Sequence, residues 1–252
     1  MRCNIIKVIG LVFLSNLIGC AHFFESAQDQ EKAKVYLQLA ADQFSQKEFG
    51  KATSSVHQSL RFVPDQPLAY NQLGIIYMET KRYAKSEEAF KKALQLQPNF
   101  PEVDNNLGVL LNRQEKYREA MSYFQKALDN EQYSTPENAL TNMGYSFFKT
   151  GDNLKAKTFH QKALEMTPQF CLANKNMGDV YAKEKNFDKA AEYFKKAATT
   201  CPLYQESQYK LGLALMKAGQ KSMAKTQLEK LVDRYKQGPY VERSQEVLKY
   251  LN

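Results

Sequence analysis

Apolar residues recur along this chain at helical spacing, in units of about 34 residues. In one unit, Tyr70, Leu73 and Tyr77 lie three and four residues apart, which places them on one face of a helix. A second apolar stripe contains Phe90, and Pro98 ends it because proline lacks the amide hydrogen that a helix interior needs. The pattern therefore predicts a pair of helices in each unit.

A glycine that follows an apolar residue marks the same place in five successive units. The intervals between these glycines are 34, 36, 34 and 34 residues, and the excess of two predicts a longer loop at residues 131–136. Repeats of this period form solenoids, in which each unit packs against its neighbours. A weaker copy without the glycine starts at Ala33, so we expect six units over residues 33–238. The five glycines are Gly74, Gly108, Gly144, Gly178 and Gly212.

The small and aromatic residues of each unit resemble the tetratricopeptide repeat. Small residues occupy repeat positions 8, 20 and 27, aromatic residues lie near positions 4, 11, 17 and 24, and proline is at position 32, counted from Pro67. The resemblance implies an all-α fold, a tetratricopeptide-repeat superhelix of six helix-turn-helix repeats. Residues 239–252 follow the sixth repeat, and we expect them to form a C-terminal capping helix.

The first twenty residues differ from the repeats. An apolar run of 11 residues follows a basic start, whereas a membrane-spanning helix needs about 20. We interpret residues 1–19 as a signal peptide. The ending Leu17, Ile18, Gly19 and Cys20 resembles a bacterial lipobox, which implies lipidation of Cys20. The alternative is an ordinary secretory signal with a chance cysteine.

The lipobox resemblance also implies a location. Acyl chains on Cys20 would anchor the chain, and more than one chain makes such anchoring stable. Ala21 is not the aspartate that retains many such lipoproteins at the inner membrane. The resemblance therefore implies an outer-membrane, lipid-anchored protein that faces the periplasm, with residues 20–32 as a tether.

Two further cysteines lie at the two ends of the fifth repeat. Cys171 is at position 1 and Cys201 at position 31. The start of the first helix and the end of the second lie at the same end of a hairpin, and the periplasm is oxidising, so we predict a disulfide. Two reduced cysteines at turns are the alternative. No histidine or further cysteine completes a metal site beside them, so we expect no metal.

The sequence shows no catalytic motif. It contains no HExxH, no GxSxG and no phosphate-binding glycine loop. His160 is at position 24, where other repeats place phenylalanine, and we interpret it as a core residue. Lys175 and Asp179 lie four residues apart on one helix, which is typical of an intrahelical ion pair. We therefore expect no enzyme activity, no cofactor and no small-molecule substrate.

The net charge of +8 would favour an acidic partner or anionic membrane heads. The basic residues are not concentrated in one long run. Lysine pairs such as Lys91-Lys92 indicate a polar outer face, and we expect no nucleic-acid partner.

The first helices of the repeats are expected to line a groove that binds a partner protein. In tetratricopeptide arrays, positions 2, 5, 9 and 12 of the first helix face this groove. Here they combine apolar side chains, which accept an apolar helix face, with amides, which pair with a peptide backbone. Packing of some of these residues against neighbouring repeats is the alternative. The predicted groove residues are Leu68, Asn71, Ile75, Met78, Asn105, Val109, Asn112, Thr141, Tyr145, Phe148, Tyr209 and Leu213.

Six such repeats behind a lipobox resemble the secretin pilotins of the type IV pilus, the PilF/PilW/Tgl family. The cysteine pair in the fifth repeat is similar to the Tgl branch, which is associated with gliding motility. The resemblance implies an assembly factor whose groove holds a segment of the outer-membrane secretin. The alternative is a periplasmic lipoprotein scaffold for peptidoglycan hydrolases or other cell-envelope complexes.

Overall fold

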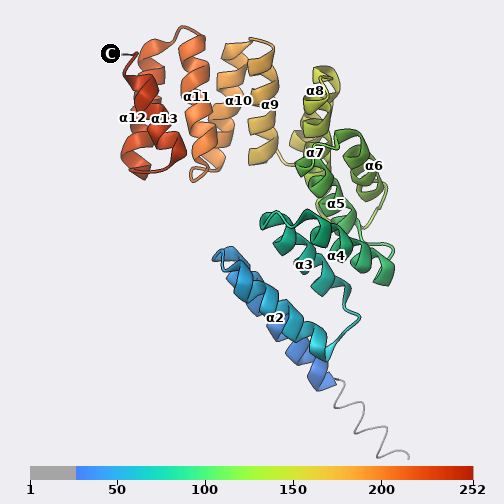
Figure 1. Ribbon diagram of the computed structural model, residues 1–252. Coiled ribbons are helices and arrows are strands. Elements are labelled where there is room, and N and C mark those ends of the chain that lie inside the picture. Colours follow the sequence, from blue (N-terminus) through green and yellow to red (C-terminus); the bar gives the residue numbers. More distant parts are fainter. Residues whose placement is uncertain (1–26, 252) are drawn as a thin grey trace, which may run out of the picture. The chain divides into compact units, whose positions relative to one another are not determined.

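The computed structural model describes residues 27–251, and every regular element among them is a helix (Figure 1). Contacts divide the chain into two compact units that meet inside α5 (Pro101–Arg113), the first ending at Asn106 and the second beginning at Leu107. The predicted signal peptide and the lipidation site at Cys20 lie outside the described residues.

The first unit consists of two hairpins and the start of α5. Residues 27–45 are helical, and α2 (Phe49–Phe62), α3 (Pro67–Glu79) and α4 (Tyr83–Leu96) follow. This first helix includes residues 27–32, which were predicted as part of the tether. These helices share a buried apolar cluster that contains Ala40, Val56 and Ile76. The region of the weak first repeat is therefore packed on the second.

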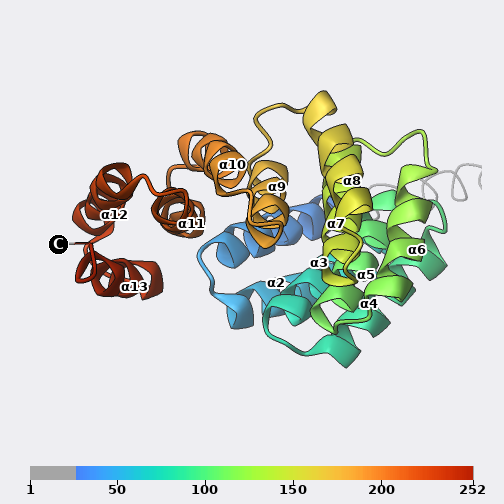
Figure 2. The same ribbon diagram turned by 90° about the horizontal axis from the view of Figure 1, so that it is seen from above.

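The second unit continues the same arrangement in pairs. Helix α7 packs against α8, α9 against α10 and α11 against α12, and each pair contacts the next. Figure 2 shows α13 beside α11 and α12 at the C-terminal end, where Val241 is buried. The helices are α6 (Tyr117–Leu128), α7 (Pro136–Lys149), α8 (Asn153–Met166), α9 (Cys171–Lys183), α10 (Phe187–Thr200), α11 (Gln205–Lys217), α12 (Lys221–Tyr235) and α13 (Pro239–Leu248).

The repeating glycine lets the two helices of a hairpin approach each other closely. A Cβ atom at Gly178 would lie 2.6 Å from ring atoms of Phe194, closer than real Cβ contacts, so glycine is needed there. In the first hairpin, Ala40 takes the place of the glycine and Val56 the place of the phenylalanine. The larger alanine is thus accompanied by a side chain smaller than phenylalanine. The other pairs are Gly74 with Phe90, Gly108 with Phe124, Gly144 with His160 and Gly212 with Leu228.

His160 takes the place of the phenylalanine in the fourth hairpin. Its side chain is fully buried, which confirms that it is a core residue. Neither ring nitrogen has a hydrogen-bond partner among the described residues. Burial, helped by the positive charge of Lys175, lowers the pKa of His160 to about 3. The imidazole is therefore neutral at physiological pH.

Each hairpin turn places one residue, at repeat position 15, in the left-handed backbone region. Glycine fills this position in two turns, at Gly151 (φ 93°) and Gly219 (φ 80°). The other four turns hold a lysine or a glutamate, although this conformation costs a non-glycine residue about 1–2 kcal/mol. These four residues are Lys47, Lys81, Glu115 and Lys185, with φ between 60° and 62°.

The predicted all-α fold is confirmed. A longer loop follows α6, as expected from the excess of two residues, and Tyr133 from this loop is buried in the apolar cluster of α6 and α7. Across residues 27–251, the helices fall short of the length and apolar character that a membrane span requires.

Candidate partner-binding site

A pocket of about 230 Å³ lies between the first helices of three successive repeats in the second unit. Helix α5 contributes Val109 and Asn112, α7 contributes Tyr145, and α9 contributes Leu172 and Lys175. Arg113, Asn142 and Asn176 complete the lining. We call this site the first-helix pocket. It combines apolar walls with amide and hydroxyl groups, a composition suited to a peptide segment.

The amide of Asn112 is oriented by the next repeat. Its Nδ2 donates to the backbone oxygen of Asn142 at 3.5 Å, and its Oδ1 accepts from the Oγ of Ser146 at 2.8 Å. An amide nitrogen carries two hydrogens, so one remains for a ligand. The hydroxyl of Ser146 is fully buried, which fixes this arrangement between α5 and α7.

Tyr145 lines the pocket, and its hydroxyl is neutral. Burial raises its pKa, and the nearby Lys149 opposes this shift only in part. Its ring lies edge-on to Tyr117, with 6.4 Å between the ring centroids. The phenol can therefore donate a hydrogen bond from a fixed position.

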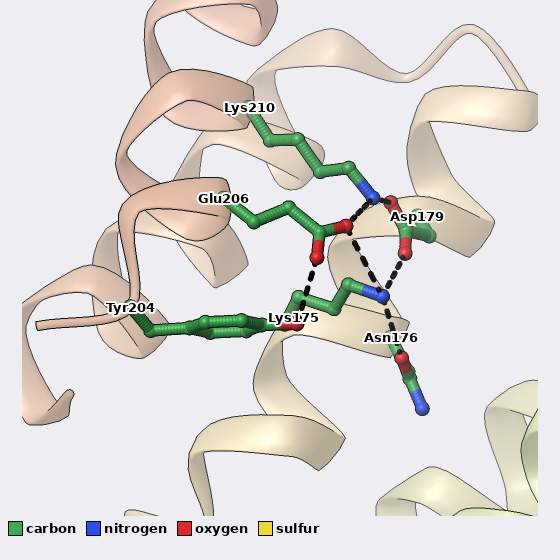
Figure 3. Close-up of polar contacts among 6 residues, drawn as sticks. All are labelled: Lys175, Asn176, Asp179, Tyr204, Glu206 and Lys210. Carbon is green, nitrogen blue, oxygen red and sulfur yellow. Dashed lines mark hydrogen bonds and ion pairs between the residues drawn. The ribbon is translucent and has the colours of Figure 1, made fainter. Parts of the chain in front are cut away.

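Four alternating charges join α9 to α11 beside the pocket (Figure 3). The Nζ of Lys175 lies 3.0 Å from Asp179 and 3.5 Å from Glu206. The Nζ of Lys210 lies 2.7 Å from Asp179 and 2.6 Å from Glu206. Tyr204 donates a hydrogen bond to Glu206 at 2.7 Å. We call these five residues the charge cluster.

Mutual pairing keeps the charge cluster ionised. Burial by itself would raise the pKa of Glu206, but Lys210, Lys175 and Tyr204 together lower it to about 2. Burial would lower the pKa of Lys210, but Asp179 and Glu206 reverse this, and its pKa is raised. The cluster is balanced in charge, so Lys175 brings little net positive charge to the pocket.

The predicted ion pair of Lys175 with Asp179 is confirmed, but the charge cluster is larger than predicted. Glu206 is at position 2 of the sixth repeat, a groove position by the repeat frame, and Leu172 is at position 2 of the fifth. Neither residue was predicted as a groove residue, although counting repeat positions would have identified both. Lys210 is at position 6, where three other repeats have asparagine. This difference was the one further feature of the sequence that could have indicated the charge cluster.

The predicted groove residues of the second unit lie in different surroundings. Val109, Asn112 and Tyr145 are brought together in the pocket. Thr141 is fully buried, and the ring of Phe148 is covered by Lys183, whose Nζ lies 4.7 Å from the ring centroid. The other two residues, Tyr209 and Leu213, do not line the pocket. The ring of Tyr209 lies beside the ring of Tyr240, and Leu213 is partly exposed.

In the first unit, the predicted groove residues range from exposed to buried. Leu68 is 58% exposed and Ile75 is partly exposed. The side chain of Asn71 accepts a hydrogen bond from Asn106 at 2.9 Å. Met78 and Asn105 are buried. Contact of a partner with any of these residues stays a prediction, and the buried ones would need the helices to move.

The two cysteines of the fifth repeat meet at one end of the hairpin. Helix α9 begins at Cys171, and Cys201 directly follows α10. The structure joins them in a disulfide, with 6.1 Å between the Cα atoms. This Cα separation is typical of disulfides. Their oxidation in the cell stays a prediction. Within residues 27–251, no group of three or more His, Cys, Asp or Glu residues could hold a metal ion.

Comparison with protein families identifies five repeats. Models described as tetratricopeptide repeat match residues 67–100, 105–129, 137–170, 171–204 and 206–238. Together these matches span more than half of the chain. A search of curated proteins gives no match.

Solved structures with this fold include PilW and PilF. PilW, titled a widely conserved type IV pilus biogenesis factor, is 26% identical with a TM-score of 0.73, over 84% of this chain and 97% of that chain. PilF of Pseudomonas aeruginosa is 19% identical with a TM-score of 0.70, over 87% of this chain and 99% of that chain.

A third structure shows how widely the fold is shared. The APC/C hetero-tetramer Cut9-Hcn1 is 16% identical with a TM-score of 0.76, over 91% of this chain and 45% of that chain. At this identity the likeness concerns the fold alone. The chain belongs to the tetratricopeptide-repeat family, and over most of its length it is similar to the type IV pilus biogenesis factor PilW and shares the fold of PilF.

Proposed function

We propose that this protein is an outer-membrane lipoprotein that acts as a pilotin for the type IV pilus secretin. It binds a segment of the secretin and helps the ring to assemble, without catalysing a reaction. The similarity to PilW, which extends over 97% of that chain, carries the proposal. The repeat fold supports it, because such arrays present binding surfaces.

The first-helix pocket supplies the contacts that this role needs. Val109 and Leu172 would pack against apolar side chains of the secretin segment. The remaining amide hydrogen of Asn112 would pair with a peptide carbonyl, and the hydroxyl of Tyr145 would donate a second hydrogen bond. Main-chain pairing gives affinity, and the apolar contacts give selectivity for the segment.

The proposed anchor would keep the repeats close to the membrane. Six residues separate Cys20 from the first described residue, Ala27. A fully extended chain spans at most about 3.5 Å per residue, so the part of the tether before Ala27 would span at most about 25 Å. A secretin segment bound by the repeats would therefore be held near the membrane into which the ring inserts.

Deletion of the gene tests the assembly role. We expect secretin monomers to accumulate and heat-resistant multimers to disappear from the outer membrane. Re-expression of the wild-type chain should restore the multimers, whereas Cys20→Ala should not. Unchanged multimers in the deletion strain would reject the pilotin role.

A matched pair of variants tests the pocket. Val109→Asp places a charge in the pocket and should reduce secretin recovery in co-purification from detergent extracts at least fivefold. Leu154→Asp makes a similar change on α8 at a side chain that is 74% exposed, and should leave recovery unchanged. Equal secretin recovery with both variants would show that the first-helix pocket is not the binding site. Recovery of a cell-wall hydrolase in place of the secretin would support the scaffold alternative.

A further inference from the structure

A second groove lies on the side of the repeats formed by the second helices. It has a volume of about 660 Å³ and runs between α10 and α12, with α11 as its floor. Leu211 and Leu215 form the floor, and Ala191 and Met223 contribute to the walls. The side chain of Met223 is 57% exposed. We call this site the second-helix groove. It shares no residue with the first-helix pocket.

Three cations gather at one end of the second-helix groove. Lys195 lies in the second half of α10, and Lys230 and Arg234 lie in the second half of α12. All three side chains are exposed. No ion pair joins any of them to a carboxylate among the described residues. Arg234 lies over the ring of Tyr235, with 5.7 Å from its Cζ to the ring centroid.

The carboxylates of the same groove are already engaged. Asp188 accepts a hydrogen bond from Gln220 at 3.1 Å, and Glu192 pairs with Lys196 at 2.7 Å. The lining therefore carries three positive and two negative charges, and Lys195 and Lys230 have no carboxylate partner beside the apolar floor. A ligand that supplies carboxylates next to apolar side chains would complement both features.

A groove in the first unit has the same lining charge, three cations and two carboxylates, but its cations are paired differently. This groove has a volume of about 910 Å³ and is lined by α3 and α4. There Lys91 pairs with Glu87 at 2.6 Å. Lys85 and Lys92 lie over tyrosine rings, with 6.0 Å from each Nζ to the ring centroid. All three cations of that groove therefore have a carboxylate or ring contact, whereas Lys195 and Lys230 of the second-helix groove have neither among the described residues.

We propose that the second-helix groove binds an acidic amphipathic segment of a second partner protein. Apolar side chains of the segment would pack on Met223 and on the leucine floor, as an amphipathic helix packs in a groove. Its carboxylates would face Lys195, Lys230 and Arg234. Because this groove and the first-helix pocket are lined by different residues, the protein would hold two partners at once.

Peptide titration against the full chain, purified in detergent, tests this proposal. The probe is a fluorescein-labelled 16-residue helical peptide with leucine along one face and glutamate on both flanks. A second peptide carries lysine at each glutamate position. We expect the glutamate peptide to bind at least tenfold more tightly by fluorescence anisotropy, and the difference to shrink at high salt because exposed charges are screened.

Two charge-reversal variants locate the site. Lys230→Glu with Arg234→Glu should weaken binding of the glutamate peptide at least tenfold. The control, Lys221→Glu with Lys225→Glu, makes the same change of charge on α12 at residues that do not line the groove, and should bind within twofold of wild type. If circular dichroism shows that the first variant is unfolded, Lys230→Gln with Arg234→Gln should still weaken binding at least threefold.

Three results would overturn the proposal. The two peptides could bind equally, the control variant could lose as much affinity as the groove variant, or the folded groove variant could retain full affinity. None of these results bears on secretin assembly, which the gene deletion tests separately.

Discussion

The imidazole of His160 occupies the space that a side chain at Gly144 would need. A Cβ atom at residue 144 would lie 2.6 Å from Cε1 of His160 and 3.1 Å from the backbone oxygen of Ala156. The ring is enclosed in the core, and the backbone of α8 cannot shift easily. We therefore expect Gly144→Ala to reduce the free energy of unfolding by about 1–3 kcal/mol, as overpacking usually does.

Urea unfolding followed by circular dichroism measures this effect, and Gly50→Ala is the matched control. Gly50 lies in α2 with no atom within 4 Å of an added Cβ. Alanine favours a helix over glycine by up to about 1 kcal/mol, so this variant should be more stable than wild type. If both variants were stabilised, the hairpin contact would not require glycine.

Acid should weaken the fold through His160. Its pKa is about 3 in the folded chain, below the ordinary value of 6.5. The unfolded chain therefore binds the proton more readily below pH 6.5. This contribution to stability is complete above pH 6.5 and falls as the pH drops towards 3. At about 1.4 kcal/mol per pH unit, the loss between pH 7 and pH 5 is about 2 kcal/mol.

His160→Phe isolates this contribution, because phenylalanine fills the same position in three other hairpins. Urea unfolding at pH 7 and pH 5 should show a smaller acid loss in the variant than in wild type. His57→Gln, at an exposed residue of α2, is the control and should retain the wild-type loss. A variant that lost stability in acid as steeply as wild type would show that other groups cause the effect.

Within the charge cluster, the ion pair of Glu206 with Lys210 on α11 should be stronger than an exposed pair. A double-mutant cycle with Glu206→Gln and Lys210→Met should give a coupling of about 1 kcal/mol or more, above the ~0.2–1 kcal/mol of exposed pairs. The reason is that both side chains are less than one-third exposed, at 19% and 28%. Thermal unfolding measures the cycle.

The pair of Lys196 with Glu192 provides the comparison for this cycle. It has the same four-residue spacing, but its side chains are 50% and 57% exposed. Its coupling should stay below about 0.5 kcal/mol, as for other exposed helix pairs. Equal coupling in the two cycles would mean that burial does not strengthen the cluster.

The disulfide of the fifth repeat can be tested by counting thiols. With Cys20→Ala and residues 1–19 removed, the native chain should show no reactive thiol before reduction and two after it. Cys171→Ser with Cys201→Ser should lower the free energy of unfolding by about 3–4 kcal/mol in the chain-entropy model. Two freely reactive thiols before reduction would contradict the pairing.

The hairpins were predictable because their main contact is local. Gly144 and His160 are 16 residues apart within one repeat, and the same two positions recur in the other repeats. The repeating pattern therefore indicates this contact. The turns were less visible, since Lys81 and Glu115 are not typical turn residues and their left-handed backbone appears only in the structure. A repeat frame identifies equivalent positions but not the space around each one.

The binding site shows the same limit. Val109, Asn112 and Tyr145 were predicted as groove residues, and they line one pocket. Thr141 occupies an equivalent frame position but is fully buried, because its exposure depends on how neighbouring repeats pack. Leu172 could have been predicted from its repeat position alone. The charge cluster could not, because it depends on the distance between α9 and α11, which the repeat pattern does not give.

Acid acts unevenly along this array because of the histidine in the fourth hairpin. In a linear array, stability is approximately a sum of terms from each repeat and from its interfaces with neighbouring repeats. Proton uptake linked to His160 lowers the term of one central repeat and leaves the terms of the other repeats unchanged. The protection of amide hydrogens against exchange in α7 and α8 should therefore fall more between pH 7 and pH 5 than the protection of those in the other helices.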